Sequence, residues 1–306
     1  ALVSQSIVKL PDALGDFERA ISIRSELVEG ENRLDLAADL AQTHIYRGQV
    51  RRSRNELLEA QEDYQRAIDV YTSQPGEPLS RELSLAYNGL ALVQLDQGQF
   101  EQALESCGRA LEITPAEGAT DRAVALNNRG EAFRHLKQYA EARRDFEEAL
   151  GIYYELVQSA PQQPMRELAI TRQNLARVKL AQGELVGAVE DSTRSLEIVL
   201  ILLEEQGRAE VLPHLVAGYT TRGIARARLE QLEAGLKDLG RAIDLYKFLI
   251  EDREQSIFLD DLGEVYHERA QALLKLGRSS YDSPDRLYFP KQALDDYNRA
   301  LQCFEM

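Results

Sequence analysis

The sequence predicts an all-α chain in which antiparallel helix pairs repeat along its length. A short phrase of the type Asp-aromatic-x-Arg-Ala, with substitutions, recurs seven times within the 306 residues. A second helical phrase precedes most of these copies, as in the segment that runs from Tyr87 to Gly98. A repeated pair of phrases indicates one supersecondary unit stacked many times rather than a single large core.

The recurring phrase has the spacing of one buried helix face. In the third copy Ala103, Cys107 and Ala110 stand at i, i+4 and i+7, which places them on the same side of a helix. Small residues there allow a neighbouring helix to approach closely, while the larger residue fills the gap. Gly48, Gly98, Gly183 and Gly277 stand where we expect a helix to stop at a residue with positive φ.

These phrases give the expected elements in chain order. Residues 1–30 hold a helix of the second type, about 11–28, whose first-type partner is missing. Six helix pairs follow, so that about thirteen helices form one solenoid over residues 1–306. The stretch 278–290 is rich in Ser and Pro and is expected to be a loop. The six expected pairs are 31–75, 80–115, 119–158, 163–205, 208–252 and 256–306.

The pattern resembles that of the tetratricopeptide repeat. The segment that begins at Tyr87 matches the family pattern nearly completely, through Leu90, Ala91, Gly98, Phe100, Ala103, Ala110 and Pro115. The resemblance implies a right-handed superhelical solenoid of antiparallel helix pairs. The period departs from the usual 34 residues, because most copies here are spaced by 39 to 47 residues. The extra residues mostly follow the second helix of each pair, so a long-period variant with longer helices is expected.

At both ends of the chain the pattern of helix pairs is incomplete. The first helix lacks a partner, and no polar capping helix is evident after the last one, although solenoids need caps on their apolar end faces. We therefore expect a segment of a larger polypeptide, which could carry a further domain. The alternative is a chain with ragged but self-sufficient ends.

Composition excludes several classes of function. The formal net charge is −15, and such a surface repels nucleic-acid phosphates and anionic membranes. The longest apolar run, 198–203, is far shorter than a membrane span. Cys107 and Cys303 have no metal-like spacing and suit a reducing compartment. A cytoplasmic location is expected, although a truncated N-terminus would hide a signal.

An Arg–Asp pair is expected to tie together the two helices of several hairpins. Arg occupies one position of three first helices, and the second helix of the same pair carries Asp each time; Leu40, Leu90 and Leu175 fill that position elsewhere. A partly buried bridge of this kind sets the register more than it adds stability. Contact with a charged ligand is the alternative. The expected pairs are Arg129 with Asp145, Arg222 with Asp238, and Arg269 with Asp296.

The resemblance also implies a ligand groove lined by the first helices. Amide side chains at the matching positions can donate and accept hydrogen bonds, which suits an extended peptide backbone. The Lys/Asn/Asn/Lys/Arg set with which some family members clamp a C-terminal carboxylate is absent. The expected groove residues are Gln42, Asn88, Asn127, Glu131, Arg134, Gln173, Arg177, Thr220, His267 and Gln271.

No catalytic, metal or cofactor site is expected. Glu264 and His267 have the spacing of one di-metal ligand pair, but such a site needs a second copy and two more Glu. No HExxH, P-loop, GxGxxG or GxSxG motif occurs. The apolar run 198–203 and the loop 278–290, with Tyr281, Tyr288 and Phe289, are further candidate contact surfaces; burial against the array is the alternative for both.

The sequence therefore predicts a non-enzymatic scaffold that binds a protein or peptide of unknown identity in a concave groove, with no nucleic acid, membrane or cofactor. Two alternatives remain open. One is a regulatory sensor array that controls an attached or partner effector domain, as in the bacterial peptide receptors that it resembles. The other is a structural module that self-associates through uncapped ends.

Overall fold

The computed structural model describes residues 10–73, 80–159, 165–204, 207, 209–252, 258–279 and 288–305. Within these ranges every regular element is helical, and thirteen of them are α-helices. The predicted all-α repeat fold is therefore confirmed. Tertiary contacts divide the chain into two compact units, 1–153 and 154–306, which are described one at a time. That the two units form one continuous solenoid stays a prediction, and so do the predicted repeat boundaries.

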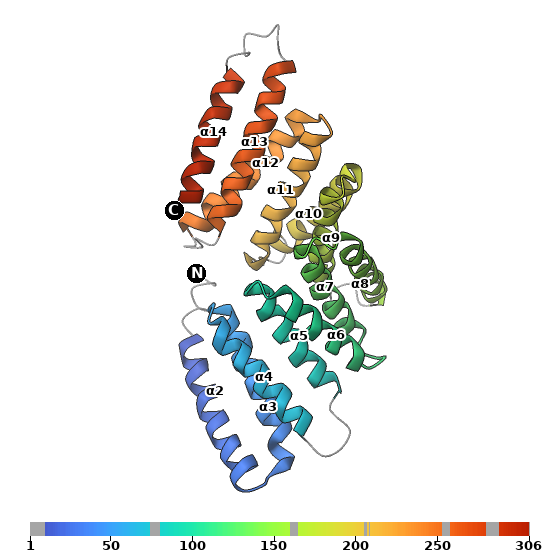
Figure 1. The fold of residues 1–306 in the computed structure, drawn as a ribbon, viewed down its shortest axis with the longest axis vertical. Coiled ribbons are helices and arrows are strands. Elements are labelled where there is room, and N and C mark those ends of the chain that lie inside the picture. Colours follow the sequence, from blue (N-terminus) through green and yellow to red (C-terminus); the bar gives the residue numbers. More distant parts are fainter. Residues whose placement is uncertain are drawn as a thin grey trace. The chain divides into compact units, whose positions relative to one another are not determined.

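Unit 1 begins with a single helix, α2 (Leu10–Ser25), and continues with helical hairpins (Figure 1). Helix α4 of the first hairpin packs on α5, and α6 packs on α7, so that each hairpin stacks on the next. The last turns of α8 belong to unit 2. The hairpins are α3 (Ala37–Ser53) with α4 (Leu57–Ser73), α5 (Ser80–Asp96) with α6 (Phe100–Ile113), and α7 (Ala119–His135) with α8 (Tyr139–Ser159).

Unit 2 repeats the same plan with three hairpins (Figure 1). Helix α10 packs on α11, and α12 packs on α13. A π-helical turn, Phe248–Asp252, continues α12. The hairpins are α9 (Met165–Ala181) with α10 (Leu185–Glu204), α11 (Leu212–Arg228) with α12 (Leu232–Lys247), and α13 (Leu259–Ser279) with α14 (Tyr288–Glu305).

Two of the second helices, α8 and α10, are long, as the period predicted. Helix α8 has 21 residues and α10 has 20, whereas α6 has 14 and stops just before Pro115. The added turns carry apolar side chains into the core: Val199 and Leu202 of α10 are each 1% exposed. The apolar run 198–203 therefore lies mostly against neighbouring helices, and only Ile201 is exposed.

Each of the first five hairpins closes through a turn whose middle residue has positive φ. This residue is Gly98 (φ 72°) or Gly183 (φ 80°) in two turns, as predicted. In the other three it is Asn55, Lys137 or Glu230, with φ near 60°, where an L side chain is strained. The sequence missed these turns because their residues do not have the usual glycine signal.

Gly48 and Gly277 were wrongly predicted as helix stops. Both lie inside helices, α3 and α13. Gly48 is needed for packing, since a Cβ there would lie 3.1 Å from the Tyr64 ring of α4. Gly130 faces Phe146 and Gly223 faces Leu239 in the same way. The glycine of the first helix thus makes room for the large residue of the second.

Candidate functional site

The buried Asp of the second helix joins the two helices of a hairpin. Arg129 Nε donates to Asp145 Oδ2 at 2.7 Å, and Arg222 Nε donates to Asp238 Oδ2 at 2.8 Å. In the last hairpin Arg269 Nη2 donates to the other oxygen of its aspartate, Asp296 Oδ1, at 2.7 Å. The three aspartates are at most 5% exposed. These residues are therefore engaged with one another inside the array.

The first hairpin has an Arg–Asp pair of the same kind, which the comparison of the repeats in the sequence missed. Arg47 pairs with Asp63 at the same spacing of 16 residues as Arg129 with Asp145. The prediction had placed Leu40 at this position, seven residues too early, because it aligned Gly48 with the turn glycines. The same shift moves the groove position from Gln42 to Gln49, which is exposed.

Asp63 has more hydrogen-bonding partners than the single Arg that the Arg–Asp pattern of the repeats indicates. Arg51 donates to its Oδ2 at 2.8 Å, and His44 Nδ1 lies 3.0 Å from its Oδ1. Burial by itself would raise the pKa of Asp63, but hydrogen bonds from His44 and Arg47 and the charges of Arg47 and Arg51 outweigh it and lower that pKa. The Asp63 cluster thus holds its carboxylate ionised inside α3–α4.

Two buried aspartates of unit 2 are also each bonded to two cationic side chains. Asp238 accepts from Arg226 at 2.7 Å in addition to Arg222. Asp191 has no Arg at the repeat position, which is Leu175, and instead accepts from Arg172 and Lys179, each at 2.6 Å. Sequence reasoning missed these partners because they stand one helical turn to either side of the position that it compared.

Two of the predicted groove residues are buried between repeats. Asn88 is 4% exposed and its Nδ2 lies 3.4 Å from the carbonyl oxygen of Asp121. Gln173 is 2% exposed, and its Nε2 donates to the carbonyl oxygen of Ala217 at 2.9 Å and to Thr221 Oγ1 at 2.7 Å. Both amides link one first helix to the next, so they are not available to a ligand in this structure.

Gln42 is half-buried on α3, and the remaining predicted groove residues of unit 1 lie on α7. Arg134 Nη2 donates to Glu131 Oε1 at 2.6 Å, and the His135 ring stacks on Phe100 with centroids 4.4 Å apart. Burial lowers the pKa of Arg134, but its hydrogen bonds to Glu131 and the charges of Glu131 and Tyr139 together outweigh this, and the net shift is upward. Asn127 is half-buried.

Unit 2 has a polar cluster to which three successive first helices contribute. Arg177 comes from α9, His214 from α11, and Asp261 and Glu264 from α13; the charge of Arg177 acts on each of the other three. His214 is half-buried, and burial together with the charges of Arg166 and Arg177 lowers its pKa to about 4. We name Arg177, His214, Asp261 and Glu264 the unit 2 groove cluster.

Asp261 and Glu264 are exposed residues, although their carboxyl groups are partly withdrawn from water. Burial raises the pKa of Asp261, and the nearby charge of Asp260 adds to this, although Arg177 opposes it. Burial likewise raises the pKa of Glu264, followed by repulsion from Asp261 and Asp260. A ligand cation or hydrogen-bond donor at this place would stabilise both charges.

Further along α13, two predicted groove residues continue the same helix face. His267 Nε2 lies 2.7 Å from Gln271 Nε2, and the His267 ring meets Tyr297 edge-on at 5.3 Å. Both residues are exposed. Thr220 of α11 is half-buried, and its hydroxyl oxygen has no hydrogen-bond partner among the described residues; burial raises the pKa of the nearby Tyr246 to about 12. That Arg177, Thr220, His267 and Gln271 contact a ligand stays a prediction, and the sequence did not place Asp261 and Glu264 near Arg177.

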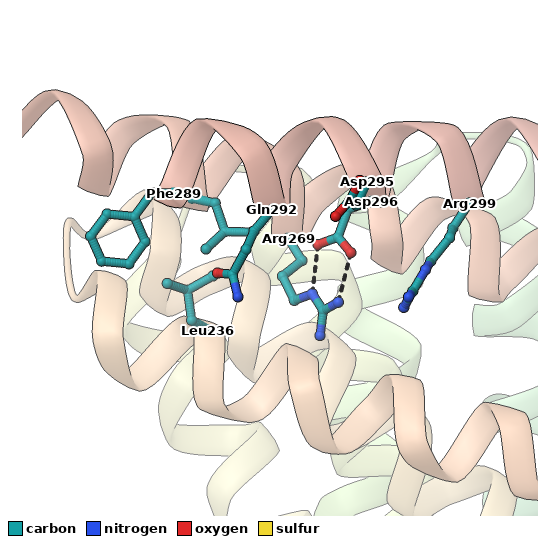
Figure 2. A pocket seen from close by; sticks show the side chains of 8 residues that line it. Leu236, Arg269, Phe289, Gln292, Asp295, Asp296 and Arg299 are labelled. Carbon is teal, nitrogen blue, oxygen red and sulfur yellow. Dashed lines mark hydrogen bonds and ion pairs between the residues drawn. The ribbon is translucent and has the colours of Figure 1, made fainter. Parts of the chain in front are cut away.

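A separate cavity of ≈ 350 Å³ lies between α12, α13 and α14. Figure 2 shows the ion pair of Arg269 and Asp296 in its wall, with Phe289 toward one end and Arg299 toward the other. Since Arg269 is already paired, Gln292, Asp295 and Arg299 carry the remaining polar groups. Tyr281 of the predicted contact loop lies outside the described residues.

Nothing in the described part of the chain brings three or more His, Cys, Asp or Glu side chains into a metal-binding group. Cys107 is buried, and burial raises the pKa of its thiol to about 12. None of the described helices has the length and apolar character that crossing a membrane requires.

Stacked hairpins of this kind define the class of helical-repeat solenoids, in which each repeat contacts mainly its neighbours. Residues 39–116 and 82–155 match the family model of the tetratricopeptide repeat. Residues 39–155 therefore carry tetratricopeptide repeats, as the sequence predicted, and repeats of this family suggest a protein–protein interaction scaffold.

Known proteins resemble the chain mainly in fold. Over 104 residues it is 35% identical to the dynein axonemal assembly factor 4 of Rattus norvegicus, a match that spans 33% of this chain and 24% of that protein. BtubC of P. vanneervenii shares the fold with a TM-score of 0.63, at 17% identity over 79% of this chain and 92% of its own. The apo form of RapI does so with a TM-score of 0.56, at 13% identity over 87% and 97%.

Proposed function

We propose that this chain is a non-enzymatic scaffold that binds an extended segment of a protein partner along the face lined by its first helices, without a cofactor. The observation that carries the proposal is the unit 2 groove cluster. In this cluster the charge of Arg177 acts on two carboxylates whose pKa values are raised, and all three residues stand on first helices, the helices that we expect to line the groove.

The chemistry of this cluster suits a polypeptide. The Arg177 guanidinium donates to backbone carbonyls or to a carboxylate, whereas Asp261 and Glu264 accept from backbone N–H groups or from a basic side chain. His267 and Gln271 extend the polar surface along α13. A rigid surface built on helices leaves only the peptide to lose conformational freedom on binding. The proposed ligand is therefore an extended segment with a Lys or Arg placed near the two carboxylates.

Photocrosslinking tests this proposal. A photoreactive amino acid replaces Gln271 on the proposed face, and in a matched protein it replaces Arg241, an exposed residue of the second helix α12. Each protein is exposed to native lysate and irradiated, and the adducts are identified by mass spectrometry. We expect a partner to be captured from position 271 and not from position 241.

The same capture is repeated with the variant Arg177→Ala/Asp261→Asn/Glu264→Gln. Loss of the adduct, with the helical circular-dichroism signal unchanged, is expected because the variant removes the charges that orient the peptide. An adduct formed equally well from position 241, or retained in full by the triple variant, would refute binding on this face.

A further inference from the structure

The cavity between α12, α13 and α14 lies where other hairpins place a long cationic side chain. Four residues beyond the Arg position of the Arg–Asp pair, three other first helices carry a cation that donates to the buried Asp of its hairpin at 2.8, 2.6 and 2.7 Å: Arg51, Lys179 and Arg226. The last hairpin has Leu273 at this position, and Leu273 lines the cavity. Because Leu273 cannot form such a bond to Asp296, the space beside that carboxylate remains open to a ligand.

The same exchange coincides with a cavity in unit 1. A cavity of ≈ 330 Å³ lies at the equivalent place in α7–α8, where Phe133 stands at the repeat position of Leu273. Each of its lining residues corresponds by repeat position to a residue that lines the cavity in unit 2. The cavity in unit 2 also has Leu236 of α12 in its wall, so it lies on the side of α14 that faces α12. It is therefore a property of this hairpin and the one before it.

The cavity in unit 2 presents two charges that are not engaged. Among the described residues neither Asp295 nor Arg299 has a hydrogen bond or an ion pair, although they stand one helical turn apart on α14. Both Arg269 and Arg299 lie over the Tyr266 ring, 5.6 and 5.7 Å from its centroid. Figure 2 shows that Arg269 is bonded to Asp296, whereas the Arg299 guanidinium lies apart from this pair. Arg299 is therefore a positioned cation that is free to bind an anion.

We propose that this cavity binds a free α-amino acid with an apolar side chain, such as leucine. The ligand ammonium donates to Asp296, as the second cation does in the other hairpins, and Asp295 balances its charge. The ligand carboxylate accepts from Arg299, and the apolar side chain packs on Leu273 and Phe289. A carboxylate and a guanidinium one helical turn apart match the short separation of the two charges of an amino acid.

The size of the cavity supports a ligand of this kind. Its volume of ≈ 350 Å³ is at the small end of the range for ligand sites, which suits a single amino acid. The site shares no residue with the unit 2 groove cluster, so it is independent of the proposed scaffold function.

Saturation-transfer difference NMR on the whole chain tests the chemistry of the ligand. L-leucine is expected to bind with a dissociation constant of roughly 10 μM to 1 mM, since so small a ligand has few contacts. L-leucinamide lacks the carboxylate, N-acetyl-L-leucine lacks the ammonium and glycine lacks the side chain, and each should bind roughly tenfold more weakly or not at all.

Two outcomes of this comparison would overturn the proposal. One is that leucine shows no saturation transfer at millimolar concentration. The other is that leucinamide or N-acetyl-leucine binds as well as leucine; in the second case the cavity would suit the C-terminus of a peptide instead. The comparison uses the unaltered chain, so it stays decisive if a variant fails to fold.

A pair of matched variants locates the binding. Arg299→Gln is expected to abolish saturation transfer to leucine. Arg241→Gln removes the Arg at the same repeat position of α12, which lies over the Tyr219 ring and outside this cavity, and should leave binding unchanged. Both arginines are exposed, so neither change should disturb folding. Leucine binding that survives Arg299→Gln overturns the site.

Filling the cavity gives an independent test of its place. Leu273→Arg supplies the cation that Arg226 supplies in α11–α12, and it is expected to abolish leucine binding. The matched control is Phe133→Arg, which makes the same exchange in α7–α8. It should leave leucine binding unchanged, because Glu148 stands there at the repeat position of Arg299 and cannot bind a carboxylate. Equal binding by the two variants, with the helical circular-dichroism signal intact, overturns the site.

Discussion

The number of cations around a buried Asp should decide what an Arg of the first helix contributes to stability. Asp145 is 5% exposed, and among the described residues it forms an ion pair with Arg129. Asp238 is 1% exposed but is bonded to both Arg222 and Arg226. Arg129→Leu therefore leaves a buried charge unpaired, whereas Arg222→Leu leaves one pair in place.

The two substitutions should lower the Tm by measurably different amounts. Removing one partner of a buried pair costs about 3–5 kcal/mol, and the 30% exposure of the Arg129 side chain favours the lower end. Losing one of two charged hydrogen-bond partners costs about 1.5–3 kcal/mol. At about 2–4 °C per kcal/mol, Arg129→Leu should lower the Tm by roughly 6–12 °C and Arg222→Leu by about half as much.

Thermal unfolding followed by far-UV circular dichroism gives the Tm. Because repeat arrays need not unfold in one step, hydrogen exchange is used to show whether the loss of stability lies in α7–α8 or in α11–α12. The control is Arg109→Leu, which removes an exposed ion pair with Glu112 and should cost less than about 1 kcal/mol. The double variant Arg129→Leu/Asp145→Leu should recover most of the loss. Equal effects of Arg129→Leu and Arg222→Leu would refute the reasoning.

Three further outcomes are expected. Lys137→Gly should stabilise unit 1 by about 0.5–1 kcal/mol in a urea titration because glycine relieves the positive φ; a loss of stability would contradict this. Gly89→Ala should destabilise by about 1–3 kcal/mol because it displaces the Tyr64 ring, whereas Gly108→Ala, with open space around it, should stabilise slightly; equal Tm shifts would contradict the packing argument. Because the folded pKa of Glu264 is raised, its contribution to stability falls as pH rises through the range just above the ordinary value of 4.5. Since Glu264 is exposed and solvent screens its charge, Glu264→Gln should remove this fall but gain no more than about 0.5 kcal/mol at pH 7, which melts at pH 4 and pH 7 would check.

Local spacing was enough to identify the repeats. The small–large–small pattern of Ala103, Cys107 and Ala110 depends on contacts between residues one or two turns apart, and such contacts are visible in any single helix. The same pattern, repeated along the chain, predicted the helix pairs, the longer second helices and the Arg–Asp pairs at Arg129 and Arg222. These features are local, or they repeat at a constant spacing.

The sequence predictions were wrong where one residue type at the same spacing can make different contacts. Gly48 has the same spacing as a turn glycine, and only the Tyr64 ring packed against it shows that it lies inside α3. That one misplacement shifted the register of the first hairpin and hid the Arg47–Asp63 pair. Gln173 has the right helix position for a groove residue, but its burial depends on how close α11 approaches.

The sequence by itself determined the repeated all-α hairpins and the residues that join their helices, because these depend on helical periodicity. Only the tertiary structure decided which polar side chains face solvent. The unit 2 groove cluster shows the reason: Arg177 belongs to α9 and the carboxylates Asp261 and Glu264 belong to α13, so no periodicity within one helix relates the cation to the carboxylates. The effect of the Arg177 charge on these carboxylates arises only when the hairpins are stacked.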